Sequence, residues 1–204
     1  MDTKITVINK SFDRNNSHVV IYQKNVATGY GETSVAWKVI ENCGYEWSHT
    51  FNVPTAFEVL AEDSFGNVSN QKKAINGQKW EVVKSDSGDI LQLVSANAAS
   101  STEVEVKNSL SLGSIDTMIY KEGRMVCSKT GVSPGEKSVF EFQPYIYVGV
   151  NSRVEQGDAL NSAILSDFNT KFCLAGIEEA NLIMTGGGVG KDATPFKFDL
   201  VVLR

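Results

Sequence analysis

The chain has 204 residues, enough to bury a full hydrophobic core as one large domain or as two packed halves. Apolar residues make up 42% and charged residues 21%, which is ordinary for a globular protein and excludes a disordered chain. The net charge of −5 argues against a nucleic-acid partner, because phosphate binding needs a clustered excess of lysine and arginine.

The dominant pattern along the chain is the alternation of apolar and polar residues with a period of two. It begins in residues 5–7, 19–21 and 35–37, and each run is bounded by Asn, Ser or Gly. Residues 80–83 and 90–94 flank a loop that contains glycine, which predicts a β-hairpin. Short strands separated by turn residues predict an all-β fold.

The two halves of the chain resemble each other. Residues 101–108 resemble both the start of the chain, residues 3–9, and its end, residues 194–199. Segments 19–23, 51–54 and 57–61 recur in the same order as segments 117–121, 140–144 and 146–150. We therefore predict a β-sandwich of antiparallel strands built by internal duplication.

The repeat also predicts the domain organisation. Residues 1–100 form the first β repeat and residues 101–204 the second, and no Pro/Gly/Ser-rich linker separates them. We expect the repeats to pack as one fused sandwich with pseudo-twofold symmetry, with two tandem domains as the alternative. At most one short helix is expected, in residues 158–168, where Leu160, Ile164 and Phe168 recur every four residues.

Signals for export or membrane insertion are not found in the sequence. Residues 1–20 lack a basic stretch followed by an apolar run, and no window has the ~20 apolar residues of a spanning helix. Cys43, Cys127 and Cys173 are odd in number and far apart, which predicts reduced thiols and no disulfide. We expect a cytoplasmic protein, and release by a non-classical route stays open.

The first candidate binding site is a loop present in only one repeat. The second repeat turns at Glu122-Gly123, whereas the first has an insertion over residues 25–34. Ligand-contacting residues concentrate on such loops, so Gly29, Tyr30, Gly31 and Glu32 are candidate binding residues. The competing interpretation is a tolerated surface insertion, because loop-closure entropy rises slowly with length.

A second candidate is the segment over residues 43–49, Cys-Gly-Tyr-Glu-Trp-Ser-His, in which Tyr45 and Trp47 could contact a ligand. A strand edge with both rings on one face is the alternative. A zinc site from Cys43, Glu46 and His49 would have too few ligands for a structural tetrahedral centre.

Other motifs do not indicate a metal or a cofactor. The glycine-rich residues 185–192 lack the first glycine and the hydroxyl residue of a phosphate-binding loop, and they precede a strand instead of a helix. Asp63 with Asn67, and Asp86 with Asp89, could supply oxygens to calcium, but these residue types are common in turns. We predict no metal and no cofactor.

Three function classes follow. We expect a non-enzymatic binding module, lectin-like or protein-binding, whose loops contact a carbohydrate or a protein; a homo-oligomer stays open. The alternative is a small membrane-active, pore-forming toxin with residues 160–168 as its detachable segment, and only this class implies a membrane partner. The third class is an enzyme without a recognisable motif. No catalytic residues are predicted, because no acid–base pair or activated nucleophile stands out.

Overall fold

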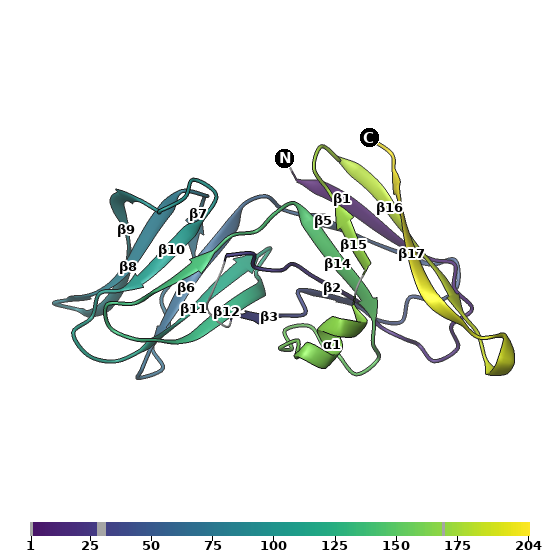
Figure 1. Ribbon diagram of the computed structural model, residues 1–204, viewed down its shortest axis with the longest axis horizontal. Coiled ribbons are helices and arrows are strands. Elements are labelled where there is room, and N and C mark those ends of the chain that lie inside the picture. Colours follow the sequence, from purple (N-terminus) through teal and green to yellow (C-terminus); the bar gives the residue numbers. More distant parts are fainter. Residues whose placement is uncertain (1, 28–31, 169) are drawn as a thin grey trace. The chain divides into compact units, whose positions relative to one another are not determined.

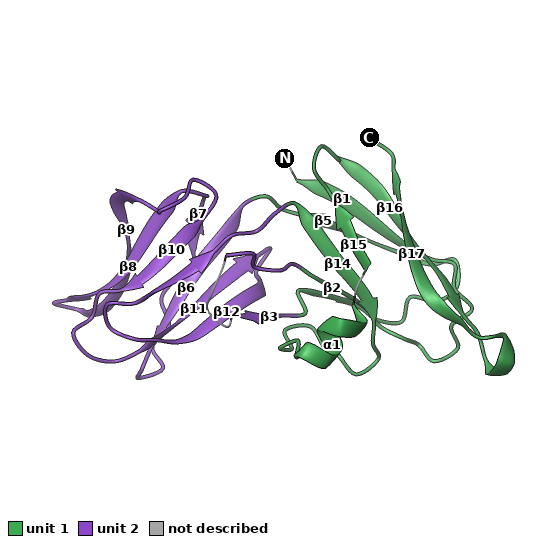
Figure 2. Cartoon of the chain, in the orientation of Figure 1, with its two compact units in different colours: residues 1–22, 36–55, 144–204 green, residues 23–35, 56–143 purple. Residues whose placement is uncertain are grey.

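The computed structural model describes residues 2–27, 32–168 and 170–204 and contains two compact units (Figures 1 and 2). Unit 1 consists of residues 1–22, 36–55 and 144–204, and unit 2 of residues 23–35 and 56–143. Residue 100 lies inside unit 2, so these units follow a division different from the predicted repeats. The assignment of residues 1–100 and 101–204 to two repeats stays a prediction.

Unit 1 contains two four-stranded sheets, with strand orders β17-β16-β1-β5 and β15-β14-β2-β4. The strands are β1 (Thr3–Asn9), β2 (Val19–Tyr22), β4 (Lys38–Ile40), β5 (Ser48–Val53), β14 (Tyr145–Val150), β15 (Thr170–Cys173), β16 (Glu179–Gly187) and β17 (Thr194–Val202). Unit 1 also holds the short helix α1 (Ser162–Asp167) and the 3₁₀ turn η1 (Gly190–Asp192). The helix lies within the stretch predicted from the sequence.

Unit 2 contains a four-stranded sheet of order β13-β10-β8-β9 and a five-stranded sheet of order β3-β12-β11-β6-β7. The strands are β3 (Thr33–Ser34), β6 (Phe57–Asp63), β7 (Lys72–Ala74), β8 (Gln78–Ser85), β9 (Gly88–Asn97), β10 (Val104–Asn108), β11 (Ile115–Lys121), β12 (Arg124–Val132) and β13 (Lys137–Phe140). The predicted hairpin of residues 80–94 is confirmed as the antiparallel pair β8 and β9.

The mostly-β, largely antiparallel fold is confirmed, with one difference. Strands β1 and β16 pair in parallel, and so do β10 and β8. In both units the parallel pair is flanked by an antiparallel hairpin on one side, β16/β17 or β8/β9, and by an antiparallel strand on the other, β5 or β13. The two units therefore share a pairing scheme that sequence alternation could not reveal.

Each unit has its own apolar core. In β1, Ile5 and Val7 are buried while Lys4 is exposed, as a strand with one buried face requires. Unit 2 buries a cluster drawn from both of its sheets, including Val104 and Val106 from β10 and Ile119 from β11. Since the apolar positions alternate, Glu105 and Lys107 of β10 face away from this core.

The turn at Glu122-Gly123 joins β11 to β12, as predicted. Both residues have positive φ, 50° and 69°, which matches the right-handed twist of a two-residue hairpin. Helix α1 begins at its N-cap Asn161, whose side chain accepts a hydrogen bond from the Ile164 N–H. Phe168, directly after α1, is buried against Gly149 and tethers the helix.

Candidate functional site: an aromatic patch on unit 1

Three aromatic side chains are exposed near one end of unit 1. Phe12, Tyr45 and Trp47 have exposed fractions of 69%, 56% and 70%, and we call them the aromatic patch. Phe12 follows β1, whereas Tyr45 and Trp47 precede β5, the antiparallel neighbour of β1. The rings of Phe12 and Tyr45 stack with their centroids 6.3 Å apart and their planes 14° from parallel. The predicted residues Tyr45 and Trp47 are thus joined by a ring from a different loop.

The turn that carries Tyr45 and Trp47 is fixed by Asn9, the last residue of β1. The Asn9 side-chain Nδ2 donates to the Cys43 carbonyl over 2.5 Å. The Asn9 backbone accepts from the Glu46 N–H at 2.6 Å and donates to the Trp47 carbonyl at 3.0 Å. Three hydrogen bonds to one buried residue hold the turn, so its two rings project from a defined backbone.

Glu46 lies in the left-handed region with φ 64°, an uncommon conformation for a residue with a side chain. The Trp47 N–H also donates to the Gly44 carbonyl at 3.0 Å and closes the turn. The strained backbone at Glu46 is therefore maintained by its hydrogen bonds, and it sets the positions of the rings on either side.

The glycine-rich residues 185–192 position Phe12. The Phe12 N–H donates to the Gly186 carbonyl at 2.8 Å. A Cβ on Gly187 would lie 2.9 Å from the Phe196 ring and 3.1 Å from the Asp13 nitrogen, so only glycine permits this approach. The segment connects the antiparallel strands β16 and β17, so it lies between two strands, as predicted.

Acid–base chemistry is not favoured at the patch. Burial raises the pKa of the Cys43 thiol, and the thiol donates a 3.6 Å hydrogen bond to the Trp47 carbonyl. The His49 ring packs against Phe51, with centroids 6.5 Å apart. Among the described residues, no three His, Cys, Asp or Glu side chains are grouped so that they could hold a metal ion.

Of the four candidate binding residues in the loop over residues 25–34, only Glu32 lies within the described residues. Gly29, Tyr30 and Gly31 lie outside the described residues, and their predicted role stays a prediction. Glu32 is half-buried in unit 2, and its Oε1 has no hydrogen-bond partner in the described part of the chain. Burial, helped by the Glu32 charge, raises the pKa of Cys127 to about 12. Glu32 lies in unit 2, whereas Tyr45 and Trp47 lie in unit 1, so the structure assigns these candidate residues to different units.

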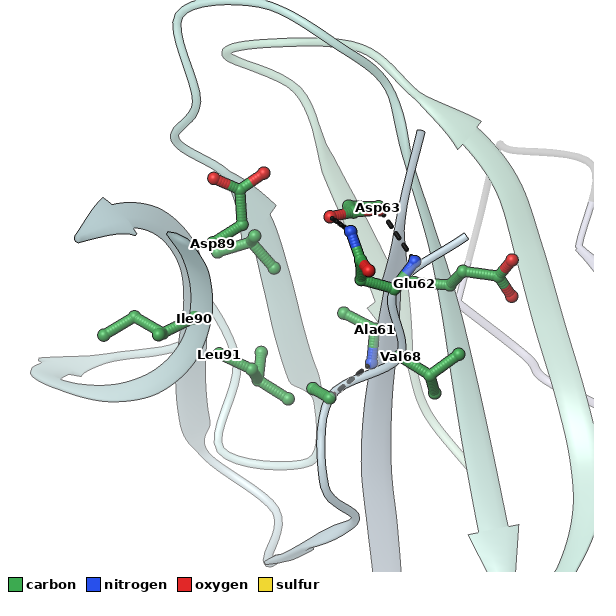
Figure 3. A pocket seen from close by; sticks show the side chains of 10 residues that line it. Ala61, Glu62, Asp63, Val68, Asp89, Ile90 and Leu91 are labelled. Atoms are coloured by element: carbon green, nitrogen blue, oxygen red, sulfur yellow. Dashed lines mark hydrogen bonds between the residues drawn. The ribbon is translucent and has the colours of Figure 1, made fainter. Parts of the chain in front are cut away.

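The oxygens of Asp63, a candidate calcium ligand in the sequence, accept hydrogen bonds from its own turn (Figure 3). Asp63 accepts from the Phe65 and Asn67 N–H groups at 2.8 and 2.9 Å and from the Asn67 side chain at 2.8 Å. These bonds, above all that from the Asn67 side chain, lower the pKa of Asp63. Asp89 lines the same pocket of about 60 Å³, whereas the Glu62 carboxylate points away from it. Asp63 is explained as a turn residue.

Sequence reasoning missed Phe12. Its signal was a single large apolar residue between polar neighbours, Ser11 and Asp13, just after a strand. Only the pairing of β1 with β5 shows that this residue lies beside Tyr45.

No helix in the described ranges combines the length and the apolar character needed to cross a membrane. Comparison of the chain with protein-family models, with curated proteins and with solved structures finds no match.

Proposed function

We propose that the protein is a non-enzymatic β-sandwich binding module that contacts its partner through the aromatic patch. The observation that carries the proposal is the exposure of Phe12, Tyr45 and Trp47 on loops held by Asn9 and Gly186. Large exposed apolar side chains that lie together mark interaction sites more often than chance exposure. A fixed backbone lowers the entropy cost of binding, because the rings are already placed.

The chemistry of the patch favours a protein partner over a carbohydrate. Phe12 offers only an apolar ring, and tryptophan and tyrosine are among the residues most enriched in binding hot spots. Phe12 stacks on Tyr45, so part of each ring is already covered and the exposed surface is a low apolar platform. Such a platform suits the apolar centre of a protein interface, whose polar rim supplies specificity.

The predicted internal duplication supports the view that the patch is dispensable for folding. Asn108 in unit 2 makes the same contacts as Asn9: it donates to the Glu136 carbonyl at 2.9 Å and accepts from the Gly135 N–H at 2.8 Å. We infer that the two turns are copies of one ancestral turn. The unit 2 copy reads Val-Ser-Pro-Gly-Glu over residues 132–136 and has no aromatic residue.

Neither alternative function class gains specific support. The toxin hypothesis needs residues 160–168 to detach, yet Leu160 and Phe168 are buried in unit 1. The Phe168 carbonyl accepts a 3.5 Å hydrogen bond from the Tyr22 hydroxyl. For an enzyme, no three His, Cys, Asp or Glu side chains of the described residues are grouped as metal ligands, and burial raises the pKa of Cys43 and of Cys127, which disfavours either thiol as a nucleophile.

Tryptophan fluorescence tests the proposal directly, because Trp37 and Trp80 are buried and Trp47 is exposed. Partners are recovered from an extract of the natural source on immobilised protein and then purified. A true partner should blue-shift the Trp47 emission and protect it from acrylamide quenching. Trp47→Ala should weaken binding by roughly 30-fold or more, the loss expected for a ~2 kcal/mol hot spot.

The matched control is Phe65→Ala, since Phe65 is 84% exposed but lies in a turn of unit 2. The proposal fails if Trp47→Ala and Phe65→Ala bind every recovered partner as tightly as the parent protein. If the parent protein is retained on a glycan array and Trp47→Ala is not, the partner of the aromatic patch is a carbohydrate and not a protein. Leakage of liposomes would instead support the membrane-active alternative.

A further inference from the structure

Unit 2 contains a cavity of about 520 Å³, a size typical of small-molecule sites. Strands β8, β10, β12 and β13 and the loop from β12 to β13 contribute to it. The residues that line it are Lys79, Glu105, Lys107, Lys129, Gly131, Val132, Gly135, Glu136 and Lys137. None of these belongs to the aromatic patch of unit 1.

The lining carries an excess of positive charge. Four lysines face two glutamates around the cavity, although the chain as a whole has a net charge of −5. Lys107 and Lys137 are directly opposite each other in the antiparallel pair β10 and β13. Like charges in this arrangement destabilise a sheet, and the ion pair between Glu105 and Lys137 offsets only part of this repulsion, so a bound anion would offset the rest.

Glu105 offsets only one positive charge of the cluster, because its carboxylate pairs with Lys137. It is only 3% exposed, and its Oε1 accepts from the Lys137 ammonium at 2.6 Å and from the Ala99 N–H at 2.9 Å. Burial raises the pKa of Glu105, but its bonds to Lys137 and Ala99 outweigh burial and leave that pKa lowered. Glu105 therefore stays ionised and orients Lys137 at the edge of the cavity.

Two glycines with left-handed backbone line one wall of the cavity. Gly131 and Gly135 have φ of 69° and 85°, and a Cβ on either residue would meet no atom within 4 Å. Their N–H groups donate within the protein, that of Gly131 to Asp116 Oδ1 at 2.8 Å and that of Gly135 to the Asn108 carbonyl at 2.8 Å. The two glycines therefore shape this wall through their left-handed backbone. The Gly135 turn is the one held by Asn108, which fixes this wall as Asn9 fixes the aromatic turn.

The lysines are not required by the fold. Ile8 and Ser48 form the directly opposed pair next to the Asn9 turn in unit 1, the place that Lys107 and Lys137 occupy next to the Asn108 turn. The same pairing scheme therefore forms without charge at these positions. This difference between the units points to a role in binding rather than in folding.

We propose that this cavity binds a multivalent oxyanion, a phosphate or sulfate group of a small ligand, between Lys107, Lys129 and Lys137. The ammonium groups supply charge-assisted hydrogen bonds to the anion oxygens. Phosphate and sulfate groups share this chemistry, so the experiment tests each of them separately.

Isothermal titration with inorganic pyrophosphate and, separately, with sodium sulfate tests the site on the full chain. Saturable binding to one of them should weaken as sodium chloride is raised. Lys107→Gln and Lys129→Gln should each weaken it about tenfold, equal to about 1.4 kcal/mol. Lys137 is left intact, because its removal would strand the buried Glu105 carboxylate.

Lys84→Gln is the matched control, since it removes the same charge from an exposed lysine of unit 2 that pairs with Asp89 outside the cavity. The control and Trp47→Ala should bind the anion as the parent does, which separates this site from the aromatic patch. The proposal is overturned if neither anion binds saturably, or if Lys84→Gln weakens binding as much as Lys107→Gln does.

Discussion

Asn9 and Asn108 make the same local hydrogen bond at the ends of two different strands. The Oδ1 of Asn9 accepts from the Ser11 N–H at 2.8 Å, and the Oδ1 of Asn108 accepts from the Leu110 N–H at 3.0 Å. Each side chain also donates through Nδ2 to the turn across the sheet, at Cys43 or Val132. One asparagine thus fixes the backbone beside each proposed binding site.

Asn108→Ala should lower the free energy of unfolding by about 3 kcal/mol, because it removes hydrogen bonds from buried backbone groups at Leu110 and Val132 and from a part-buried one at Gly113. Urea unfolding followed by circular dichroism measures the loss. The exposed Asn52→Ala is the control and should change stability by less than ~0.5 kcal/mol. A loss at Asn108 no larger than at Asn52 would contradict this role.

Asn9→Ala should loosen the aromatic turn as well as destabilise unit 1. Removing the side-chain bond to Cys43 leaves the turn that carries Trp47 held by the two backbone bonds of residue 9, so the fluorescence anisotropy of Trp47 should fall in the folded protein. Asn108→Ala should leave that anisotropy unchanged, since its turn contains no tryptophan. Equal anisotropy in both variants would show that other contacts hold the turn.

The three thiols should react at different rates with a disulfide reagent in the native protein. Cys173 is exposed and should react first. Cys127 is buried with its pKa raised to about 12, and burial also raises the pKa of Cys43, so both should react much more slowly. Unfolding in denaturant should equalise the rates, and a fast native reaction of Cys127 would refute its burial.

Stability should fall in acid partly through Glu105. Its folded pKa is lower than its ordinary value of 4.5, so the ionised carboxylate stabilises the fold above pH 4.5. That stabilisation disappears as the pH falls through the folded pKa, because the protonated acid loses its charge pairing with Lys137. Urea midpoints across this range should therefore decline less steeply in Glu105→Gln, which should also be less stable at neutral pH.

Gly149→Ala should displace Phe168 and destabilise unit 1 by about 1–3 kcal/mol, the usual cost of overpacking. An added Cβ would lie 1.9 Å from the Phe168 ring, so the ring must shift from its packed position. Urea unfolding measures the loss. Gly44→Ala is the control, since its Cβ would meet the Trp47 ring at 4.0 Å, an ordinary contact.

Local features of the fold could be predicted from sequence, whereas the long-range pairings could not. Alternation and turn residues predicted the β8/β9 hairpin and the turn at Glu122-Gly123, because these depend on adjacent residues. The parallel pairing of β1 with β16 joins residues far apart in the chain. No periodicity encodes such a partner, so the interleaved units were not foreseen.

The candidate site shows the same limit. Tyr45 and Trp47 were predicted from their own segment, but Phe12 joins them only because β1 and β5 pair. Likewise, alternation in β10 places Lys107 on an outward face, yet only the fold brings Lys129 to the same cavity. Sites assembled from several strands depend on register, which a single sequence does not specify.

Stretches of unit 1 and unit 2 alternate along the chain, and this alternation imposes an order on folding during synthesis. Unit 2 has all its strands once residue 143 has been made, whereas β1 needs β16, which lies in residues 144–204. At typical translation rates the N-terminal strands wait on the order of seconds without this neighbour. During that interval β1 presents an open ladder edge to other nascent chains, so full-length expression should depend on chaperones more than expression of unit 2 segments does.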